Sequence, residues 1–154
     1  MSEQSQKKAV ERAANVLSMR PYSCAGLYKR LLEKGVEEED AAYAVERLRE
    51  LKLLDDEQYA RDLCRSGRSK GWGAGRIRQE LRRKGVDDVC IEAVLEGFEP
   101  DDEKLRRFIL TRLGGKAPDR AALRRISDGL FRRGFSWDEI NEAIHACLEE
   151  WEDE

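Results

Sequence analysis

Basic side chains are concentrated between residues 61 and 84. That stretch holds nine basic and two acidic residues, against ten and twelve in residues 1–60 and ten and eighteen in residues 85–154. Guanidinium and ammonium groups neutralise phosphates and release the counterions that surround a nucleic acid. The stretch therefore predicts a surface for an anionic partner. Its candidate residues are Arg61, Arg65, Arg68, Lys70, Arg76, Arg78, Arg82, Arg83 and Lys84.

Three glycines alternate in the same stretch, in the segment "GWGAG" of residues 71–75. A loop that cradles the phosphates of a dinucleotide has the spacing GxGxxG and follows a strand, whereas this segment reads GxGxG after a helical pattern. We interpret it as a flexible turn in which Gly71 closes one helix and Gly73 or Gly75 lets the next begin. Trp72 has two interpretations, stacking on a base or ring or packing in the core. The aromatic Tyr22, 50 residues earlier, favours the core.

Catalytic and metal-binding patterns are not readable in the sequence. The four cysteines lie far apart without a CxxC pair, and His145 is the only histidine. Zinc sites and disulfide frameworks have closer spacings, and an activated nucleophile needs an adjacent base. We expect no enzymatic activity, no metal, no cofactor and no small-molecule substrate. The cysteines are Cys24, Cys64, Cys90 and Cys147.

The composition predicts an all-α protein. Of the 154 residues, 40 % are charged, 40 % are hydrophobic and only three are proline. The abundant Leu, Ala, Glu, Arg and Lys keep side-chain freedom in a helix. No apolar stretch approaches the roughly 20 residues of a membrane span, and the first residues lack the apolar core of a signal peptide. We expect a cytoplasmic protein with reduced thiols and no membrane partner.

A repeat of about 50 residues organises the chain. Segments "LYKRLLEKGV" (27–36), "IRQELRRKGV" (77–86) and "ISDGLFRRGF" (126–135) align at offsets of 50 and 49 residues. Each glycine is expected to end a helix in the left-handed conformation. The residue two positions later is a predicted N-cap, and Ser136 with Glu139 forms a capping box. The aligned residues are the glycines Gly35, Gly85 and Gly134, the N-caps Glu37, Asp87 and Ser136, and the apolar sets Leu27, Ile77 and Ile126, then Leu31, Leu81 and Leu130, then Ala41, Ile91 and Ile140.

One further helix precedes each pair of helices, over about residues 6–19, 56–70 and 101–113, which makes nine helices in all. We therefore expect three tandem three-helix units, over residues 1–54, 55–99 and 100–154. Units this small bury their apolar stripes by stacking, here in an elongated curved array. Such helix-turn-helix-like units bind nucleic acids in some proteins and proteins in others, so the fold alone does not decide the function.

The repeat serves as an internal control for the arginines. Arg76, Arg78, Arg82 and Arg83 lie opposite the apolar stripe of their predicted helix. A solvated helix face is the alternative interpretation of such a run. The fold does not require these charges, which favours a role in binding. The equivalent residues are Gly26, Tyr28, Leu32 and Glu33 in the first unit, and Arg125, Ser127, Phe131 and Arg132 in the third.

The last six residues form an acidic tail. They read "EEWEDE". We interpret this tail as solvated, and the alternative is that it competes with a polyanion for the basic residues.

Three segments together resemble the RecX family, which comprises bacterial regulators of the RecA recombinase. They are "RPYSCAGLYKRLLEKGV" from Arg20, "LKLLDDEQYARDLCRSGRSKGWGAGRIRQELRRKGV" from Leu51, and "LFRRGFSWDEINEAI" from Leu130. The resemblance spans about residues 8–150. It is strongest in the middle unit and loosest in the third.

The resemblance implies a non-enzymatic protein of three tandem three-helix repeats that binds the RecA filament within its helical groove. There it would restrain ATP hydrolysis and strand exchange, or favour filament disassembly, in recombinational DNA repair and the SOS response. A weaker affinity for single- or double-stranded DNA is also implied. Two alternatives stay open: a stand-alone nucleic-acid-binding module, and a protein-only adaptor whose basic face meets an acidic surface.

Overall fold

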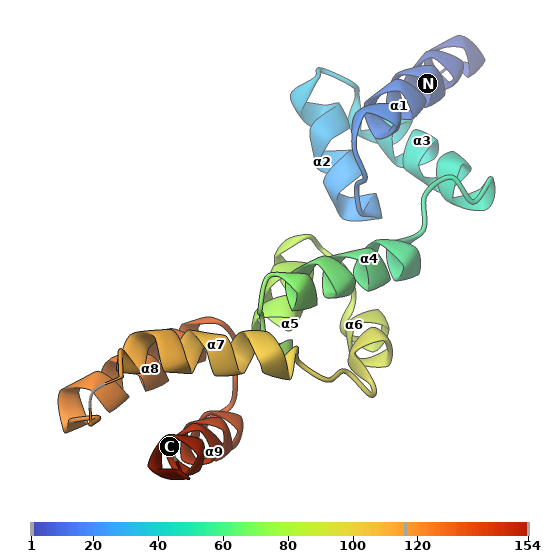
Figure 1. Ribbon diagram of the computed structural model, residues 1–154. Helices are drawn as coiled ribbons and strands as arrows, with labels where there is room; N and C mark the ends of the chain where they lie inside the picture. The colour runs from blue at the N-terminus through green and yellow to red at the C-terminus, as the bar shows by residue number, and fades with distance from the viewer. Residues whose placement is uncertain (1, 116, 154) are drawn as a thin grey trace. The chain divides into compact units, whose positions relative to one another are not determined.

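The structure is helical, as the composition predicts. It is a computed structural model that describes residues 2–115 and 117–153, with side chains described up to Glu150. These ranges hold nine helices and no strand (Figure 1). None of these helices combines the length and apolar character needed to cross a membrane. The helices are α1 (Glu3–Met19), α2 (Cys24–Glu33), α3 (Glu38–Glu50), α4 (Asp56–Ser69), α5 (Ala74–Arg83), α6 (Asp88–Leu95), α7 (Asp102–Leu113), α8 (Arg120–Arg132) and α9 (Trp137–Asp153).

Helix α1 is longer than predicted. It begins at Glu3 and not near residue 6, because Ser2 caps it. The Ser2 hydroxyl accepts a hydrogen bond from the Ser5 N–H at 3.1 Å, and the Ser5 hydroxyl oxygen accepts one from the Ser2 N–H at 3.2 Å. This reciprocal capping satisfies N–H groups that a helix start leaves free. Helices α4 and α7 lie within one residue of their predicted ranges.

The glycine and apolar positions of the repeat are confirmed. Gly35, Gly85 and Gly134 have φ angles of 87°, 80° and 96°, which is the left-handed region that glycine enters without strain. The side chains of the three apolar sets named above are all at most 1 % exposed. Equivalent residues of the repeat therefore form the core in each of its copies.

The predicted N-caps differ among the copies. The Ser136 hydroxyl accepts from the Glu139 N–H at 3.1 Å, and the Glu139 carboxylate accepts from the Ser136 N–H at 2.9 Å, which confirms the capping box. The Asp87 carboxylate accepts from the Cys90 N–H at 2.8 Å. Glu37 occupies the N-cap position of α3 but makes no side-chain cap bond. The predicted position is therefore confirmed, and the missing side-chain bond fits the preference for short polar side chains at an N-cap.

The chain packs as two bodies, which we call the first and the second body. The first comprises Met1–Asp62 and Glu80–Val94, and the second comprises Leu63–Gln79 and Leu95–Glu154. Helices α4 and α5 each contribute residues to both. The middle copy of the repeat is therefore divided between the two bodies.

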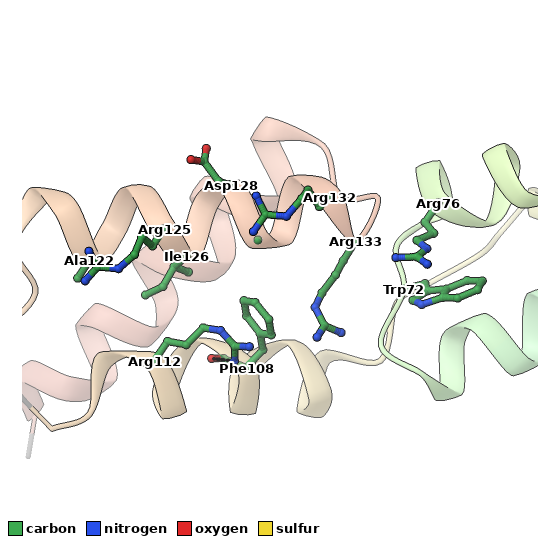
Figure 2. A pocket seen from close by; sticks show the side chains of 11 residues that line it. Trp72, Arg76, Phe108, Arg112, Ala122, Arg125, Ile126, Asp128, Arg132 and Arg133 are labelled. Atoms are coloured by element: carbon green, nitrogen blue, oxygen red, sulfur yellow. Dashed lines mark hydrogen bonds between the residues drawn. The ribbon is translucent and has the colours of Figure 1, made fainter.

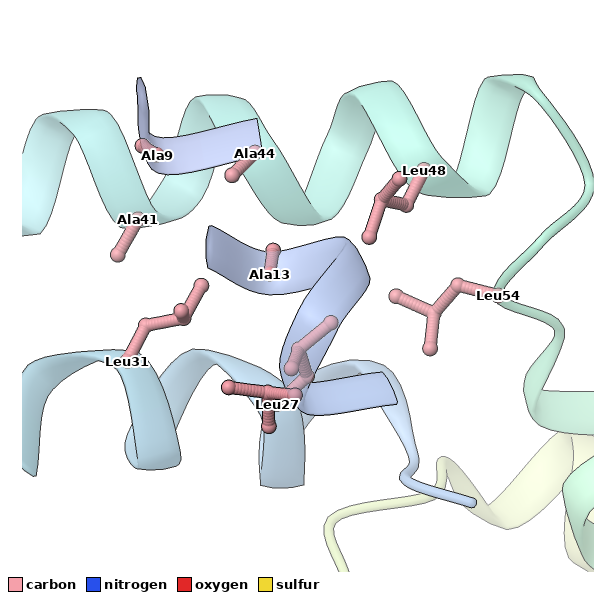
Figure 3. Packing of buried hydrophobic residues seen from close by; sticks show 9 residues of the cluster. Ala9, Ala13, Leu27, Leu31, Ala41, Ala44, Leu48 and Leu54 are labelled. Carbon is pink, nitrogen blue, oxygen red and sulfur yellow. The ribbon is translucent and has the colours of Figure 1, made fainter. Parts of the chain in front are cut away.

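Each body has its own apolar core. In the first body, small side chains of α1 and α3 let these helices pack closely, and leucines of α2 cover them (Figure 3). In the second body, α7, α8 and α9 enclose a core of larger side chains. The first core consists of Ala9, Ala13, Val16, Leu27, Leu31, Ala41, Ala44, Leu48 and Leu54. The second consists of Ile109, Leu113, Ile126, Leu130, Phe135, Ile140, Ile144 and Cys147.

In the first body, the turn after α5 packs closely on the start of α2. The Ser23 hydroxyl donates a hydrogen bond to the carbonyl oxygen of Lys84 at 2.6 Å. The same hydroxyl oxygen accepts from the Gly26 N–H at 3.0 Å and so caps α2. A Cβ atom at Gly85 would overlap the Cβ of Ala25. Glycine is therefore required here for space as well as for its positive φ.

The second body has an equivalent junction between the start of α5 and the turn after α8. The Gly73 and Gly75 N–H groups donate to the carbonyl oxygens of Arg133 and Gly134, at 2.8 and 2.9 Å. A Cβ on Gly73 or Gly75 would lie 2.6 or 2.8 Å from that Gly134 oxygen. Gly71, with a φ of 83°, closes α4 as predicted. The other two glycines thus serve a close backbone approach, which the interpretation as a flexible turn missed, and their N–H groups are engaged by carbonyl oxygens.

We expect Gly134→Ala to lower the free energy of unfolding more than Gly35→Ala. Both changes place a Cβ at positive φ, which costs about 1–2 kcal/mol. At Gly35 the new Cβ meets nothing within 4 Å, whereas at Gly134 it overlaps the backbone nitrogen of Arg76. The overlap should add about 1–3 kcal/mol. Urea unfolding followed by circular dichroism measures the difference, and equal losses would show that the junction relaxes around the methyl group.

Cys24 begins α2, and its N–H donates to the Asp56 carboxylate at 2.7 Å. Burial, and then the negative charge of Asp56, raise the pKa of its thiol to about 12. Burial also raises the pKa of the other three thiols, and all four cysteines are free. Because the thiolate is the reactive form, a raised pKa lowers reactivity near neutral pH.

Iodoacetamide at pH 8 should therefore modify Cys24 in the folded protein about a hundredfold more slowly, or slower still, than in the urea-unfolded chain. Each unit by which the pKa rises above the pH lowers the thiolate fraction about tenfold. Peptide mass spectrometry over a time course measures the two rates. Equal rates would contradict the shielded position of this thiol.

Candidate nucleic-acid interface

The structure does not bring the nine predicted basic residues together in one body. Arg61, Arg82, Arg83 and Lys84 belong to the first body, and Arg65, Arg68, Lys70, Arg76 and Arg78 belong to the second. Several of them are engaged by neighbouring carboxylates. Such exposed ion pairs contribute little to the stability of the fold, so an anion that binds the arginine more strongly can replace the carboxylate. The pairs are Arg61 with Glu57 at 2.6 Å, Arg82 with Asp88 at 3.0 Å and Arg83 with Glu80 at 2.8 Å.

Trp72 combines features of its two predicted roles, packing in the core and offering a ring for stacking. It is half-buried, and a Cβ on Gly67 would meet its ring at 2.7 Å, so the ring packs closely on α4. Two of the predicted cations lie over the indole, with the Lys70 Nζ 5.1 Å and the Arg76 Cζ 4.5 Å from a ring centroid. The tryptophan is therefore a platform for cations. Arg68, in contrast, donates from Nε to the carbonyl oxygen of Glu99 at 2.8 Å.

The second body contains a cavity of about 730 Å³, which we call the arginine cleft. Figure 2 shows Trp72 and Arg76, from the α4–α5 turn and α5, on one side and side chains of α7 and α8 on the other. Two aromatic rings and five arginines line the cleft. They are Trp72, Phe108, Arg76, Arg112, Arg125, Arg132 and Arg133.

Three guanidinium groups repel one another in the arginine cleft. The Arg112 and Arg133 side chains both approach the Phe108 ring, with Cζ atoms 3.5 and 4.6 Å from its centroid (Figure 2). Burial, and then the positive charges of Arg112 and Arg76, lower the pKa of Arg133. A like charge nearby disfavours the charged form of a group, and an opposite charge favours it. An anion in the cleft would therefore relieve the repulsion.

No carboxylate of the described side chains relieves this repulsion. Among the side chains that the structure describes, the five cleft arginines form no ion pair with Asp or Glu. Asp128 also lines the cleft, and it too makes no ion pair with a described residue. The arginine cleft thus carries an excess of positive charge.

A second hollow adjoins the arginine cleft. It has a volume of about 330 Å³ and shares Phe108, Arg112 and Arg133 with it. Lys70, Lys104 and Arg107 extend the basic lining there. The Lys104 ammonium donates to the carbonyl oxygen of Ser69, which leaves its charge near the hollow. The positive lining therefore continues beyond the cleft itself.

This arrangement is suited to phosphate. Arginine offers several N–H donors in a plane that matches phosphate geometry, and it stacks on aromatic rings while it does so. Asn or Gln side chains aimed at base edges would indicate base reading, and none lines the cleft. The chemistry favoured is therefore a salt-sensitive contact with a polyanion.

Sequence reasoning missed Phe108, Arg112 and Arg133, and it treated Arg125 and Arg132 only as equivalents in the repeat. Residues 85–154 have more acidic than basic side chains, and this excess concealed the arginines among them. The repeat alignment held the missing signal, because at its offset of 49 residues Arg133 corresponds to the predicted Lys84.

The described residues add no catalytic or metal-binding constellation. They contain no group of three His, Cys, Asp or Glu side chains that could hold a metal ion. His145 Nε2 lies 3.1 Å from a Glu149 carboxylate oxygen, and both side chains are exposed on α9. The Glu150 carboxylate accepts from Arg106 of α7, with one bond of 2.9 Å, so this part of the acidic tail is paired. The side chains of residues 151–154 lie outside the described part of the chain, and the predictions for the tail are untested there.

Family models match all three copies of the repeat. They are described as the first, second and third three-helix domains of RecX, and they match residues 9–48, 55–95 and 99–144. A regulatory protein RecX from Stenotrophomonas maltophilia is 36 % identical over 136 residues, covering 87 % of this chain and 83 % of the relative. One from Trichlorobacter lovleyi is 37 % identical over 137 residues, covering 84 % and 89 %.

Solved structures agree in fold. A crystal structure of RecX from Lactobacillus salivarius matches with a TM-score of 0.82 at 23 % identity, over 95 % of this chain and 98 % of that one. A crystal structure of a regulatory protein RecX matches with a TM-score of 0.80 at 30 % identity, over 92 % and 72 %. With three tandem domain models and relatives above 30 % identity along most of its length, this chain belongs to the RecX family of regulatory proteins.

Proposed function

We propose that this protein binds the nucleoprotein filament of the RecA recombinase and restrains its ATP hydrolysis and strand exchange. Its place in the RecX family supports the partner. The arginine cleft supports a contact with the nucleic acid that such a filament carries. The protein acts by binding and needs no cofactor of its own.

The unpaired charge of the arginine cleft is the observation that carries the proposal. Five guanidinium groups line one cavity with a single carboxylate, that of Asp128, and none of the five forms an ion pair with a described carboxylate. Phosphates entering the cleft replace the repulsion around Arg133 with attraction and release counterions. The predicted basic residues of α4 and α5 add to this hold, because their exposed ion pairs can exchange carboxylate for phosphate.

An exposed aromatic pair in the second body provides for protein recognition. The rings of Phe131 and Trp137 stack with centroids 4.7 Å apart, and the two residues are 52 % and 50 % exposed. Exposed aromatic residues are frequent anchors of protein interfaces. In the proposed complex this pair contacts the recombinase and the arginine cleft contacts phosphates.

We expect the Arg125→Glu, Arg132→Glu double variant to restrain RecA poorly. Two attractive contacts with phosphate become repulsive, so at least about tenfold more protein should be needed, equivalent to about 1.4 kcal/mol. The measurement is ATP hydrolysis by RecA filaments on single-stranded DNA, with filament length followed in parallel. The wild-type protein should slow hydrolysis in the same assay.

The Arg120→Glu, Arg124→Glu variant is the matched control. It makes the same change of charge on the same helix, α8, at exposed residues outside the lining of the cleft. It should stay close to wild type. Equal loss in both variants would assign the effect to net charge, and no effect of the wild-type protein on hydrolysis or filament length would refute the proposed function.

We expect Phe131→Ala to weaken regulation of RecA while leaving the binding of free single-stranded DNA unchanged. The change removes the ring that stacks on Trp137 but no charge. Fluorescence anisotropy with a labelled oligonucleotide, beside the ATPase assay, separates the two effects. Parallel losses in both assays would contradict a protein-contacting role for this pair.

Two rival functions have distinct outcomes in the same assays. A stand-alone nucleic-acid-binding module would bind naked DNA as tightly as it binds the filament. A protein-only adaptor would keep its hold on the filament in excess polynucleotide. The unpaired arginines favour a function in which phosphate is contacted.

A further inference from the structure

The first body carries a cleft of its own, which we call the tyrosine cleft. It has a volume of about 350 Å³ and lies at the junction of α2 with the turn after α5. Tyr22 and Tyr59 line it together with five cations and the carboxylate of Glu33. The cations are Arg20, Lys29, Arg30, Arg83 and Lys84.

The tyrosine cleft occupies the same place in the repeat as the arginine cleft. Its lining and the lining of the two hollows in the second body correspond at the repeat offsets of 50 and 49 residues. At five positions aromatic residues correspond to aromatic residues and cations to cations, whereas Lys29 and Arg30 correspond to Gln79 and Glu80. The pairs are Arg20 with Lys70, Tyr22 with Trp72, Tyr59 with Phe108, Arg83 with Arg132, and Lys84 with Arg133.

The contacts recur as well as the residue types. Arg20 Cζ lies 4.6 Å from the centroid of the Tyr22 ring, as its counterpart Lys70 lies over Trp72. The Lys84 carbonyl oxygen accepts a hydrogen bond from Ser23. The equivalent oxygen of the second body accepts one from the glycine 50 residues after Ser23. The donor is a side-chain hydroxyl at Ser23 and a backbone N–H at Gly73, but the accepting carbonyl groups are equivalent in the repeat, so equivalent junctions build both clefts.

The tyrosine cleft also carries an excess of positive charge. Arg30 pairs with Glu33 at 3.1 Å, which accounts for the carboxylate of the lining. Among the described side chains, Arg20, Lys29 and Lys84 form no ion pair with a carboxylate. The Arg20 Nε donates to the Tyr22 hydroxyl at 2.9 Å, which holds the cation at the aromatic ring.

We infer that the tyrosine cleft is a second binding site for single-stranded nucleic acid. Arg20, Lys29 and Lys84 contact the phosphates, and the tyrosine rings contact unpaired bases. Aromatic faces beside a cationic groove are how proteins hold single strands without reading sequence, whereas a duplex keeps its base faces stacked inside. The inference rests on the proposed phosphate contact of the arginine cleft, and it adds an equivalent site in the other body.

The Arg20→Gln, Lys29→Gln variant of the full chain tests it. Both residues lie outside the basic surface predicted from sequence. Anisotropy of labelled oligothymidine and oligouridine gives the affinity over a series of salt concentrations. If the wild-type protein contacts about five phosphates, log affinity should fall with log salt at a slope of roughly −3.5, and the variant should lose about 1.4 of that slope.

The Lys7→Gln, Lys8→Gln variant is the control, because it removes the same charge from exposed positions of α1 in the same body. It should keep the wild-type slope. A thermal unfolding curve for each variant shows that it is folded. The fluorescence change at Trp72 on binding, identified by its absence in Trp72→Phe, should persist in the Arg20→Gln, Lys29→Gln variant, since the arginine cleft is intact.

The outcomes separate this inference from the proposed function. An unchanged slope in Arg20→Gln, Lys29→Gln overturns the inference. If the slope also stays unchanged in Arg125→Gln, Arg132→Gln, the proposed phosphate contact of the arginine cleft fails with it. An equal loss of slope in the Lys7→Gln, Lys8→Gln control would show that net charge causes the effect and would overturn the inference. Loss of RecA regulation with unchanged slopes would also overturn it, because the tyrosine cleft would then contact a protein partner. A smaller slope with either oligonucleotide supports it.

Discussion

A backbone approach too close for any side chain is the constraint on which the rest of this structure depends. At each junction, the glycine that follows the first helix of a pair lies against the start of the preceding pair of helices, Gly85 against Ala25 and Gly134 against Arg76. The glycine has two requirements there, a positive φ and the absence of a Cβ. Gly35 shares the φ but meets nothing within 4 Å of an added Cβ. The requirement for space therefore holds only for the glycines at the two junctions, whereas all three glycines of the repeat require a positive φ.

The same approach explains why the clefts occur where they do. The carbonyl oxygen of the residue before the glycine accepts a hydrogen bond from the neighbouring helix start, as Lys84 and Arg133 show. The side chain of that residue lines the same cleft as the aromatic residue of the facing turn. Cations at flanking positions surround an aromatic pair in consequence. Both clefts are thus a product of the junctions between copies of the repeat.

The arginine cleft also shows why arginine is the suitable cation at such a position. Like charges this close destabilise one another, and burial adds to the effect at Arg133. A guanidinium offsets part of this cost by lying over an aromatic ring, as Arg112 and Arg133 do at Phe108. An anion in the cleft would remove the residual repulsion.

Sequence by itself determined the helical class, the three copies of the repeat, the glycines that end the helices and the apolar positions of the core. These features follow from the periodicity of apolar residues and from backbone preferences, both of which depend on residues close together in the sequence. It also located one side of the arginine cleft, at Trp72 and Arg76. Only the tertiary structure decided that Phe108, Arg112 and Arg133 complete that cleft. It also decided that Arg61, Arg82 and Arg83 form ion pairs with nearby carboxylates. The physical reason is that the arrangement of charges in space depends on which helix ends meet at a junction. Residues about sixty positions apart in the sequence meet there, because glycines allow the two backbones to come into contact.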